Sequence, residues 1–125
     1  MNKLKMKLIS NEEVKLEGGS NYQVVNNKMI FRVEESNYII DLDKKTFEKR
    51  DNDTNILIDI DNKIMILKLV NHPGSIDLEL TESSFVNENN EIRINYSYFL
   101  EENMNNFIHI NLYWHALILC YNLYV

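Results

Sequence analysis

The chain has 125 residues, which is the size of one compact domain around a single core. Hydrophobic residues make up 45% and charged residues 26%, a balance that excludes an intrinsically disordered chain. The net charge of −6 and the isoelectric point near 5.0 mean that phosphate backbones should repel the protein, so we expect no nucleic-acid partner.

The first predicted element is a strand at the N-terminus, where residues 3–8 alternate lysine with Leu or Met. These lysines interrupt the apolar run that a signal peptide would need. We therefore expect a cytoplasmic protein.

Residue usage favours strands over helices throughout the chain. It holds one alanine, Ala116, but 15 isoleucines and 7 valines, and β-branched side chains fit a pleated sheet. Its 19 asparagines cluster between the apolar segments, where Asn can adopt the left-handed backbone of tight turns. This composition predicts an all-β protein that turns mainly on Asn, Asp and Lys.

Strict alternation of apolar and polar residues continues down the chain and predicts roughly nine or ten short strands without a helix. It is clearest in residues 4–8, 14–16, 22–24, 29–34, 38–43, 46–50, 56–60, 63–70, 76–81, 92–98 and 108–115. Between them we expect breaks at Gly18-Gly19, Asn26-Asn27, Lys44-Lys45, Asp61-Asn62, His72-Pro73-Gly74 and 87–90.

Short connections between successive strands predict an antiparallel meander with one dry face and one wet face. A sheet of so many strands should close into a barrel, because closure removes the exposed edges. We expect one domain over residues 1–125, with an apolar C-terminal tail at 115–125 and no internal repeat.

The order of these motifs resembles the YwiB-like family of small bacterial proteins. The residues that carry the resemblance are the Tyr22–Phe31 hairpin and the segments 74–80, 90–96 and 106–110, within about residues 3 to 114. The resemblance implies a calycin-like β-barrel, related in shape to small-molecule carriers such as lipocalins. It supplies no catalytic residues, and the chain departs from the family pattern after Trp114.

The predicted inner face is apolar and carries several aromatic rings. It would contain Met29, Ile40, Ile56, Ile58, Ile76, Leu78, Ile92, Ile94, Ile108 and Ile110 besides the aromatic residues. Candidate ligand-binding residues in the barrel interior are Tyr22, Phe31, Tyr38, Tyr96, Tyr98 and Trp114. Either they line a pocket where hydroxyls orient a small apolar ligand, or the side chains simply fill the barrel.

Enzymatic and metal-binding signatures are weak. The carboxylate pairs Asp41/Asp43, Asp59/Asp61 and Asp77/Glu79 lie on the predicted wet face, where no shifted pKa is expected. The calcium-like start at Asp51 lacks the glycine and glutamate that such a loop requires. His109 and His115 would share a strand face roughly 20 Å apart, too far for one metal. The lone cysteine, Cys120, excludes an internal disulfide.

We therefore expect no catalytic residues, no metal and no cofactor. The leading hypothesis is a non-catalytic protein that binds a small apolar ligand. The alternative is a structural or interaction protein with a filled barrel. Its partner would meet its surface or the apolar tail, which either packs against the barrel end or pairs with a second copy as a homodimer. The tail is too short, and too interrupted by polar residues, for a membrane span.

Overall fold

The computed structural model of the chain describes residues 3–101 and 104–114. Ten antiparallel strands close into one barrel, so the predicted all-β class and barrel closure are confirmed. The strands are β1 (Lys3–Ser10), β2 (Glu13–Val25), β3 (Lys28–Val33), β4 (Ser36–Asp41), β5 (Thr46–Arg50), β6 (Thr54–Asp59), β7 (Ile64–Leu69), β8 (Ile76–Glu88), β9 (Glu91–Glu101) and β10 (Met104–Trp114). The tail 115–125 lies outside the described residues, as does the prediction about its packing.

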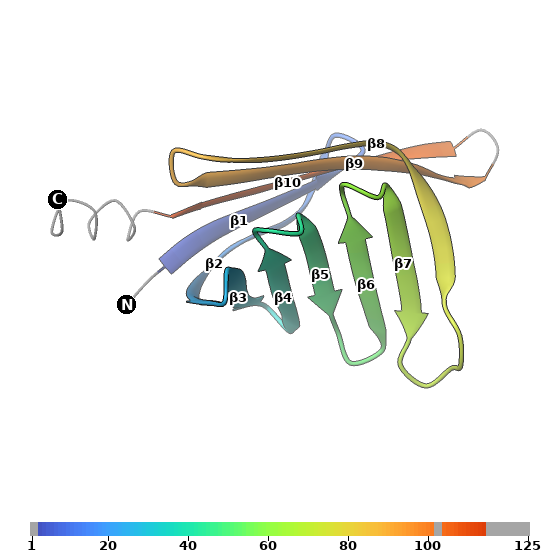
Figure 1. Cartoon of the computed structure of the whole chain (residues 1–125), viewed down its shortest axis with the longest axis horizontal. Helices are drawn as coiled ribbons and strands as arrows, with labels where there is room; N and C mark the ends of the chain where they lie inside the picture. Colours follow the sequence, from blue (N-terminus) through green and yellow to red (C-terminus); the bar gives the residue numbers. More distant parts are fainter. Residues whose placement is uncertain (1–2, 102–103, 115–125) are drawn as a thin grey trace, which may run out of the picture.

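The barrel consists of two sheets that cross. Sheet A contains β1, β10, β9 and parts of β2 and β8, whereas sheet B contains β3 to β7 and the remaining parts of β2 and β8. Figure 1 shows β8, β9 and β10 running across the top while β4 to β7 run nearly at right angles below them. Such crossed packing is usual where strands pass from one sheet to the other at the corners.

The two long strands β2 and β8 form these corners. β2 pairs with β1 as far as Asn21 and with β3 from Tyr22 onward. Gly18-Gly19 was predicted to separate two short strands, and that prediction is wrong because β2 is continuous. Gly18 instead allows the side chain of Val33 to pack closely against β2, because a Cβ added at Gly18 would lie 3.0 Å from Cγ1 of Val33.

Left-handed residues form the hairpin turns, as the asparagine content predicted. Asn26 and Asn27 have positive φ, as do Asn89 and Asn90, and each pair joins two strands directly. This is the conformation of a two-residue hairpin loop whose twist matches that of the strands. The turn predicted at Lys44-Lys45 is also confirmed, with Lys45 at φ 56°.

A repeated hydrogen bond joins the turns along one end of sheet B. In each case a residue with positive φ precedes two paired strands. Its backbone carbonyl accepts a hydrogen bond from the backbone N–H of the residue that follows the last pairing between those strands. The pairs are Asn27 with Leu42 at 2.9 Å, Lys45 with Ile60 at 3.2 Å and Lys63 with Leu80 at 2.9 Å. The segments 41–45 and 59–63 share this turn.

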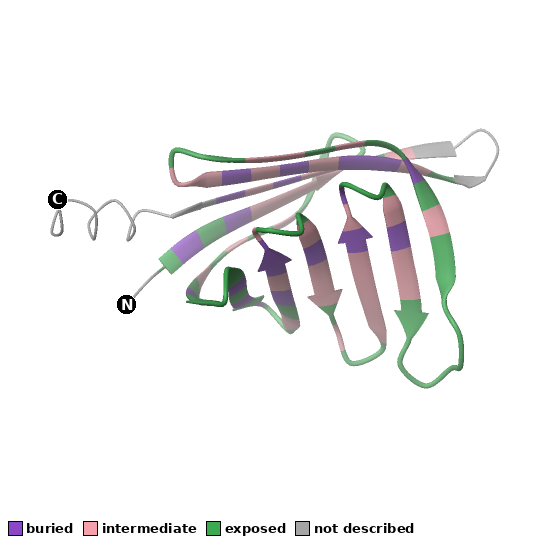
Figure 2. Ribbon diagram, in the orientation of Figure 1, coloured by how far each residue is buried: buried purple, intermediate pink, exposed green. Residues whose placement is uncertain are grey.

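The core lies between the sheets. Figure 2 shows buried residues alternating with exposed or half-buried ones along the strands. Buried apolar side chains from both sheets include Met6, Phe31, Tyr38, Ile40, Ile58, Ile92, Ile94, Ile110 and Leu112. Ile76 was predicted to be buried and is 55% exposed, because it pairs with Leu67 at the open end of sheet B.

Candidate functional site

Five of the six aromatic residues predicted for the interior have described side chains, and all five face inward. Tyr22, Phe31, Tyr38 and Tyr96 are buried, and Tyr98 packs half-buried against the core. Trp114 ends β10, and its side chain lies outside the described part of the structure.

Sheet B places three of the rings in contact. Tyr38 stacks on Phe31 with ring centroids 5.2 Å apart, and its other neighbour is Phe47 at 5.7 Å. Stacked or tilted rings at this separation stabilise a core beyond their buried area. Phe47 was not among the predicted ligand-binding residues, because its five-residue strand has too short an alternation to show which face is buried.

Sheet A contributes Tyr96 and Tyr98, with ring centroids 6.3 Å apart. Burial is the main cause that raises the pKa of Tyr96 well above its ordinary value, and nearby Tyr98 and Tyr38 raise the pKa further. Burial also raises the pKa of Tyr98. Tyr38 on sheet B and Tyr96 and Tyr98 on sheet A all belong to the core between the two sheets or pack against it. We call them the tyrosine cluster.

The hydroxyl of Tyr38 connects this cluster to the rim of the barrel. It is hydrogen-bonded to Ser36, whose hydroxyl donates to Oδ1 of Asp51. Burial raises the pKa of Tyr38, and the negative charges of Asp51 and Glu34 raise it further. Polar groups therefore lead from the interior to the rim, a path that needs contacts between separate strands and has no local signal in the sequence.

The rim itself is acidic. A pocket of about 590 Å³ is lined by Glu34, Glu35, Ser36, Asp51, Asn52 and Asp53. Lys49 lies beside it, with Nζ 3.8 Å from Oδ2 of Asp51. Four carboxylates line this pocket, and Lys49 pairs with one of them, so the pocket has a negative potential, which disfavours anions that approach it.

Two of the three predicted carboxylate pairs, Asp41/Asp43 and Asp59/Asp61, lie at turns that their first aspartate stabilises. Oδ1 of Asp41 accepts the backbone N–H groups of Asp43 and Lys44, both at 3.0 Å. The Lys44 bond is the main cause that lowers the pKa of Asp41. Asp41 was expected on the solvated face, yet its side chain is only 8% exposed because it is folded into the turn. Asp59 accepts the backbone N–H of Asn62 in the equivalent way.

The outer face of sheet A carries a second polar arrangement. A groove of about 470 Å³ is lined in part by Ser84, Asn95 and His109. Nδ1 of His109 contacts Oδ1 of Asn95, and Nδ2 of Asn95 donates to Ser84 Oγ at 3.3 Å. Sequence reasoning missed the arrangement because it depends on the register of three strands.

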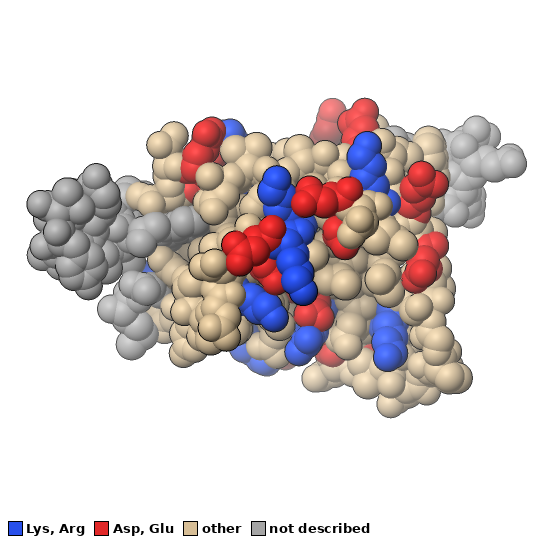
Figure 3. All heavy atoms as spheres, viewed as in Figure 1, with Lys and Arg blue, Asp and Glu red and all other residues tan. Residues whose placement is uncertain are grey.

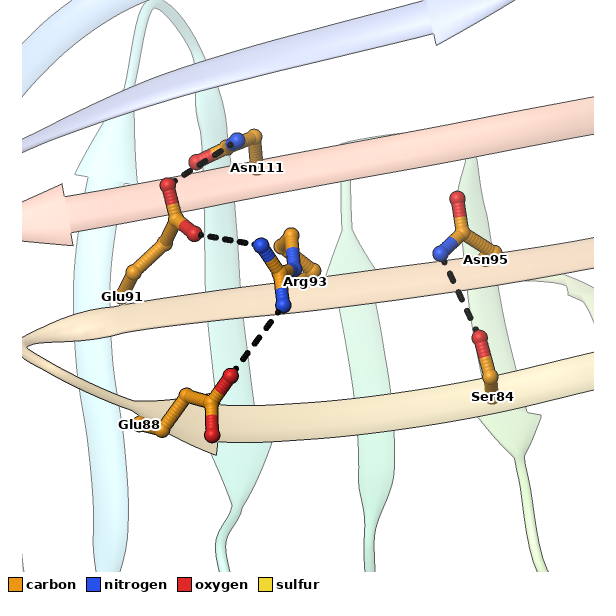
Figure 4. A network of polar contacts seen from close by, with 6 residues as sticks. All are labelled: Ser84, Glu88, Glu91, Arg93, Asn95 and Asn111. Atoms are coloured by element: carbon orange, nitrogen blue, oxygen red, sulfur yellow. Dashed lines mark hydrogen bonds and ion pairs between the residues drawn. The ribbon is translucent and has the colours of Figure 1, made fainter.

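Arg93 lies further along the same face, between two glutamates (Figure 4). Its guanidinium is 3.3 Å from Glu88 and 3.2 Å from Glu91, and Asn111 donates to Glu91 at 3.4 Å. Exposed pairs of this kind contribute little stability. Because both sides of the guanidinium have carboxylate partners, Arg93 is not arranged to hold an anion.

The part of the chain that the structure describes contains no group of three His, Cys, Asp or Glu side chains arranged to hold a metal ion. It also contains no helix with the length and apolarity needed to span a membrane.

Fold and interior together define a closed, ten-stranded antiparallel β-barrel with the tyrosine cluster in its core. Among solved structures, this architecture is similar to the crystal structure of the ywiB protein from Bacillus subtilis. The TM-score is 0.57 over 91% of each chain, at 14% sequence identity. At this identity the likeness shows a shared fold and nothing further. No family model and no curated protein matches the chain.

Proposed function

We propose that the protein is a non-catalytic cytoplasmic binding protein that takes up a small, mainly apolar molecule at the tyrosine cluster. The observation that carries the proposal is that three tyrosines, one from sheet B and two from sheet A, place their rings in a mainly apolar core. Burying a hydroxyl is unfavourable unless it gains a partner, and the hydroxyl of Tyr38 has one in Ser36. Hydroxyls in this position suit a ligand that has one polar group.

Barrel size is compatible with this proposal. An eight-stranded barrel is just wide enough to be filled by side chains or to hold one small ligand, and diameter grows with strand number. Ten strands enclose more space. The acidic rim adds a preference for a ligand whose polar end is neutral or positively charged.

The alternative is an interaction protein whose barrel is filled. The packing of buried side chains from both sheets favours this reading. The two readings differ in whether the folded protein carries or accepts a small molecule.

Native mass spectrometry of the freshly purified protein, repeated after denaturation, is the first test. Extra mass that disappears on unfolding supports the binding proposal. A neutral naphthylamine dye should also bind saturably, and better than an anionic naphthalenesulfonate dye of similar size. A bare protein mass together with no saturable dye binding would overturn the proposal and favour the filled barrel.

Single substitutions locate the site. Tyr38→Phe and Tyr98→Phe should each weaken dye binding several-fold while leaving the fold intact. Ser75→Ala removes a hydroxyl from the loop between β7 and β8 and serves as the control. Equal effects of all three variants would place the dye outside the tyrosine cluster.

A further inference from the structure

One amide group on the inner face of β10 has no hydrogen-bond partner. The inward-facing residues of this strand include Ile108, Ile110 and Leu112, which belong to the core or pack against it. Asn106 lies on the same face, because side chains two residues apart along a strand point to the same side. Its Nδ2 is buried, and the described part of the chain offers this nitrogen no acceptor.

Two hydrogen bonds determine which end of the Asn106 amide is unpaired. The backbone N–H of Phe107 donates to Oδ1 of Asn11 at 2.9 Å, and a backbone N–H can only donate. The other end of the Asn11 amide is therefore Nδ2, which donates to Oδ1 of Asn106 at 3.1 Å. Since Oδ1 of Asn106 is the acceptor, its unpaired end is the NH₂ group. A backbone donor thus orients both amides.

A buried amide nitrogen without an acceptor is unfavourable. The group has lost its hydrogen bonds to water and has gained none from the protein. Native proteins leave few such groups, and each one indicates an acceptor that binds there, either a water molecule or a ligand. The position of Asn106 relative to the tyrosine cluster distinguishes between these two.

Asn106 belongs to the same wall of the barrel as two members of the tyrosine cluster. It pairs with Tyr98, and Ile108, the next residue on this face, pairs with Tyr96. Side chains directly opposite each other on one face of an antiparallel pair have Cβ atoms roughly 4.5–5.5 Å apart. A molecule that binds Nδ2 of Asn106 therefore lies beside the ring of Tyr98.

The surroundings of Asn106 favour a neutral acceptor. Its inner-face neighbours on β8 and β9 are Leu80, Tyr96 and Tyr98, and none of them is charged at neutral pH. No lysine or arginine of the described residues is buried, and Figure 3 shows such side chains on the outer surface of the barrel. A carboxylate at Asn106 would be a buried charge without a partner, which is strongly unfavourable. A carbonyl oxygen accepts the same hydrogen bond without a charge.

We propose that the binding site recognises a neutral carbonyl group, whose oxygen accepts a hydrogen bond from Nδ2 of Asn106 beside the ring of Tyr98. The ligand class is then an apolar ketone, ester or amide. This inference rests on the proposed function, because it requires that the barrel takes up a small apolar molecule. It adds which polar group that molecule carries and which side chain binds it.

Two dyes that differ in one group test the inference. One is a dimethylaminonaphthalene with a propionyl group, and the other carries a propyl group instead, so that a methylene replaces the carbonyl. Fluorescence titration of the full chain gives a dissociation constant for each dye. Asn106→Leu should change the ratio of the two constants about fivefold against the ketone, which is the effect of one hydrogen bond of ordinary net strength. The ratio cancels any general effect of the substitution on dye binding.

Asn111→Leu is the matched control. Asn111 is on the same strand and also has a buried side-chain atom without a partner, its Oδ1. It lies on the outer face, however, where it pairs with Arg93, so its replacement should leave the ratio unchanged. Asn106→Ala serves as a second variant that removes the amide without adding bulk. Circular dichroism confirms that each variant is folded.

A measurement on the parent protein needs no variant. The carbonyl oxygen of the ketone dye gains negative charge on excitation, so a hydrogen bond to it moves the emission to longer wavelength. The dye bound to the parent should therefore emit at longer wavelength than the same dye in a hydrocarbon solvent. Emission at the hydrocarbon wavelength would overturn the inference.

The outcomes separate this inference from the proposed function. A ratio that both Asn106 variants leave unchanged, or that Asn111→Leu changes equally, overturns the inference while the binding proposal stands. Nδ2 of Asn106 would then be the partner of a water molecule. Failure of both dyes to bind the parent saturably would overturn the proposed function, and the carbonyl site with it.

Discussion

Replacing Tyr96 with phenylalanine should make the protein less sensitive to alkaline pH. The side chain is 8% exposed, and burial holds its pKa well above the ordinary value of 10.0. Between those two pKa values an unfolded chain loses the proton of Tyr96 while the folded protein keeps it. Since the unfolded state then binds fewer protons, the free energy of unfolding decreases as the pH rises.

The ionisation of one phenol sets the size of the expected change in the free energy of unfolding. A single group that differs in this way changes the free energy of unfolding by about 1.4 kcal/mol per pH unit. Below about pH 10 the phenol is protonated in both states and contributes no pH dependence. Tyr96→Phe should therefore match the parent in slope at neutral pH and show a slope smaller by about 1.4 kcal/mol per unit above about pH 10.

Urea denaturation at a series of alkaline pH values measures both slopes, and tyrosinate absorbance reports ionisation directly. The parent and the variant share their lysines and exposed tyrosines. The contributions of these groups to the pH dependence therefore cancel when the two proteins are compared. Tyr98→Phe serves as the control, because this half-buried phenol should produce a smaller change. Parallel curves for the parent and Tyr96→Phe would refute the reasoning, since they would mean that Tyr96 ionises as easily in the folded protein as in the unfolded chain.

Three further substitutions test the turn, the corner and the core. Asp41→Asn should reduce the loss of thermal stability in acid, because the lowered pKa of Asp41 contributes stability that disappears as pH falls through that value; melting curves at descending pH measure this. Gly18→Ala should be less stable than Gly19→Ala by about 1 kcal/mol in urea, since only the former crowds Val33; equal stability would contradict this. Ile58→Ala, at a fully buried position, should cost about 2–5 kcal/mol in the same assay, and a loss below 1 kcal/mol would indicate loose packing there.

The alternation of apolar and polar residues along the chain predicted most of the fold. It predicted the strands and the left-handed turns at Asn26-Asn27, because both depend on residues next to one another in sequence. It misread β2, since a glycine pair that lets Val33 approach looks the same in sequence as one that forms a turn. The exposure of Ile76 also depends on where a sheet ends, which alternation does not encode.

Only part of the candidate site could be predicted from the sequence. Inward-facing aromatic residues could be predicted from their strands, but their neighbours could not. The link from Tyr38 through Ser36 to Asp51 joins β4 to the turn after β5, and the chain of Ser84, Asn95 and His109 crosses β8, β9 and β10. Alternation assigns a face to each residue, whereas such contacts need the register between strands.

Ring closure between β1 and β10 has a consequence for synthesis of the chain. β1 emerges from the ribosome before β10, its partner about a hundred residues later in the chain, since Leu4 pairs with Trp114. Until then one edge of β1 has no native neighbour, and a nascent strand in this state is exposed to mispairing with other chains. Lys3 and Lys5 are exposed and Lys7 is half-buried beside the buried Leu4 and Met6. Charge of this kind on an unpaired edge discourages aggregation, so the lysines protect the strand until β10 has been synthesised.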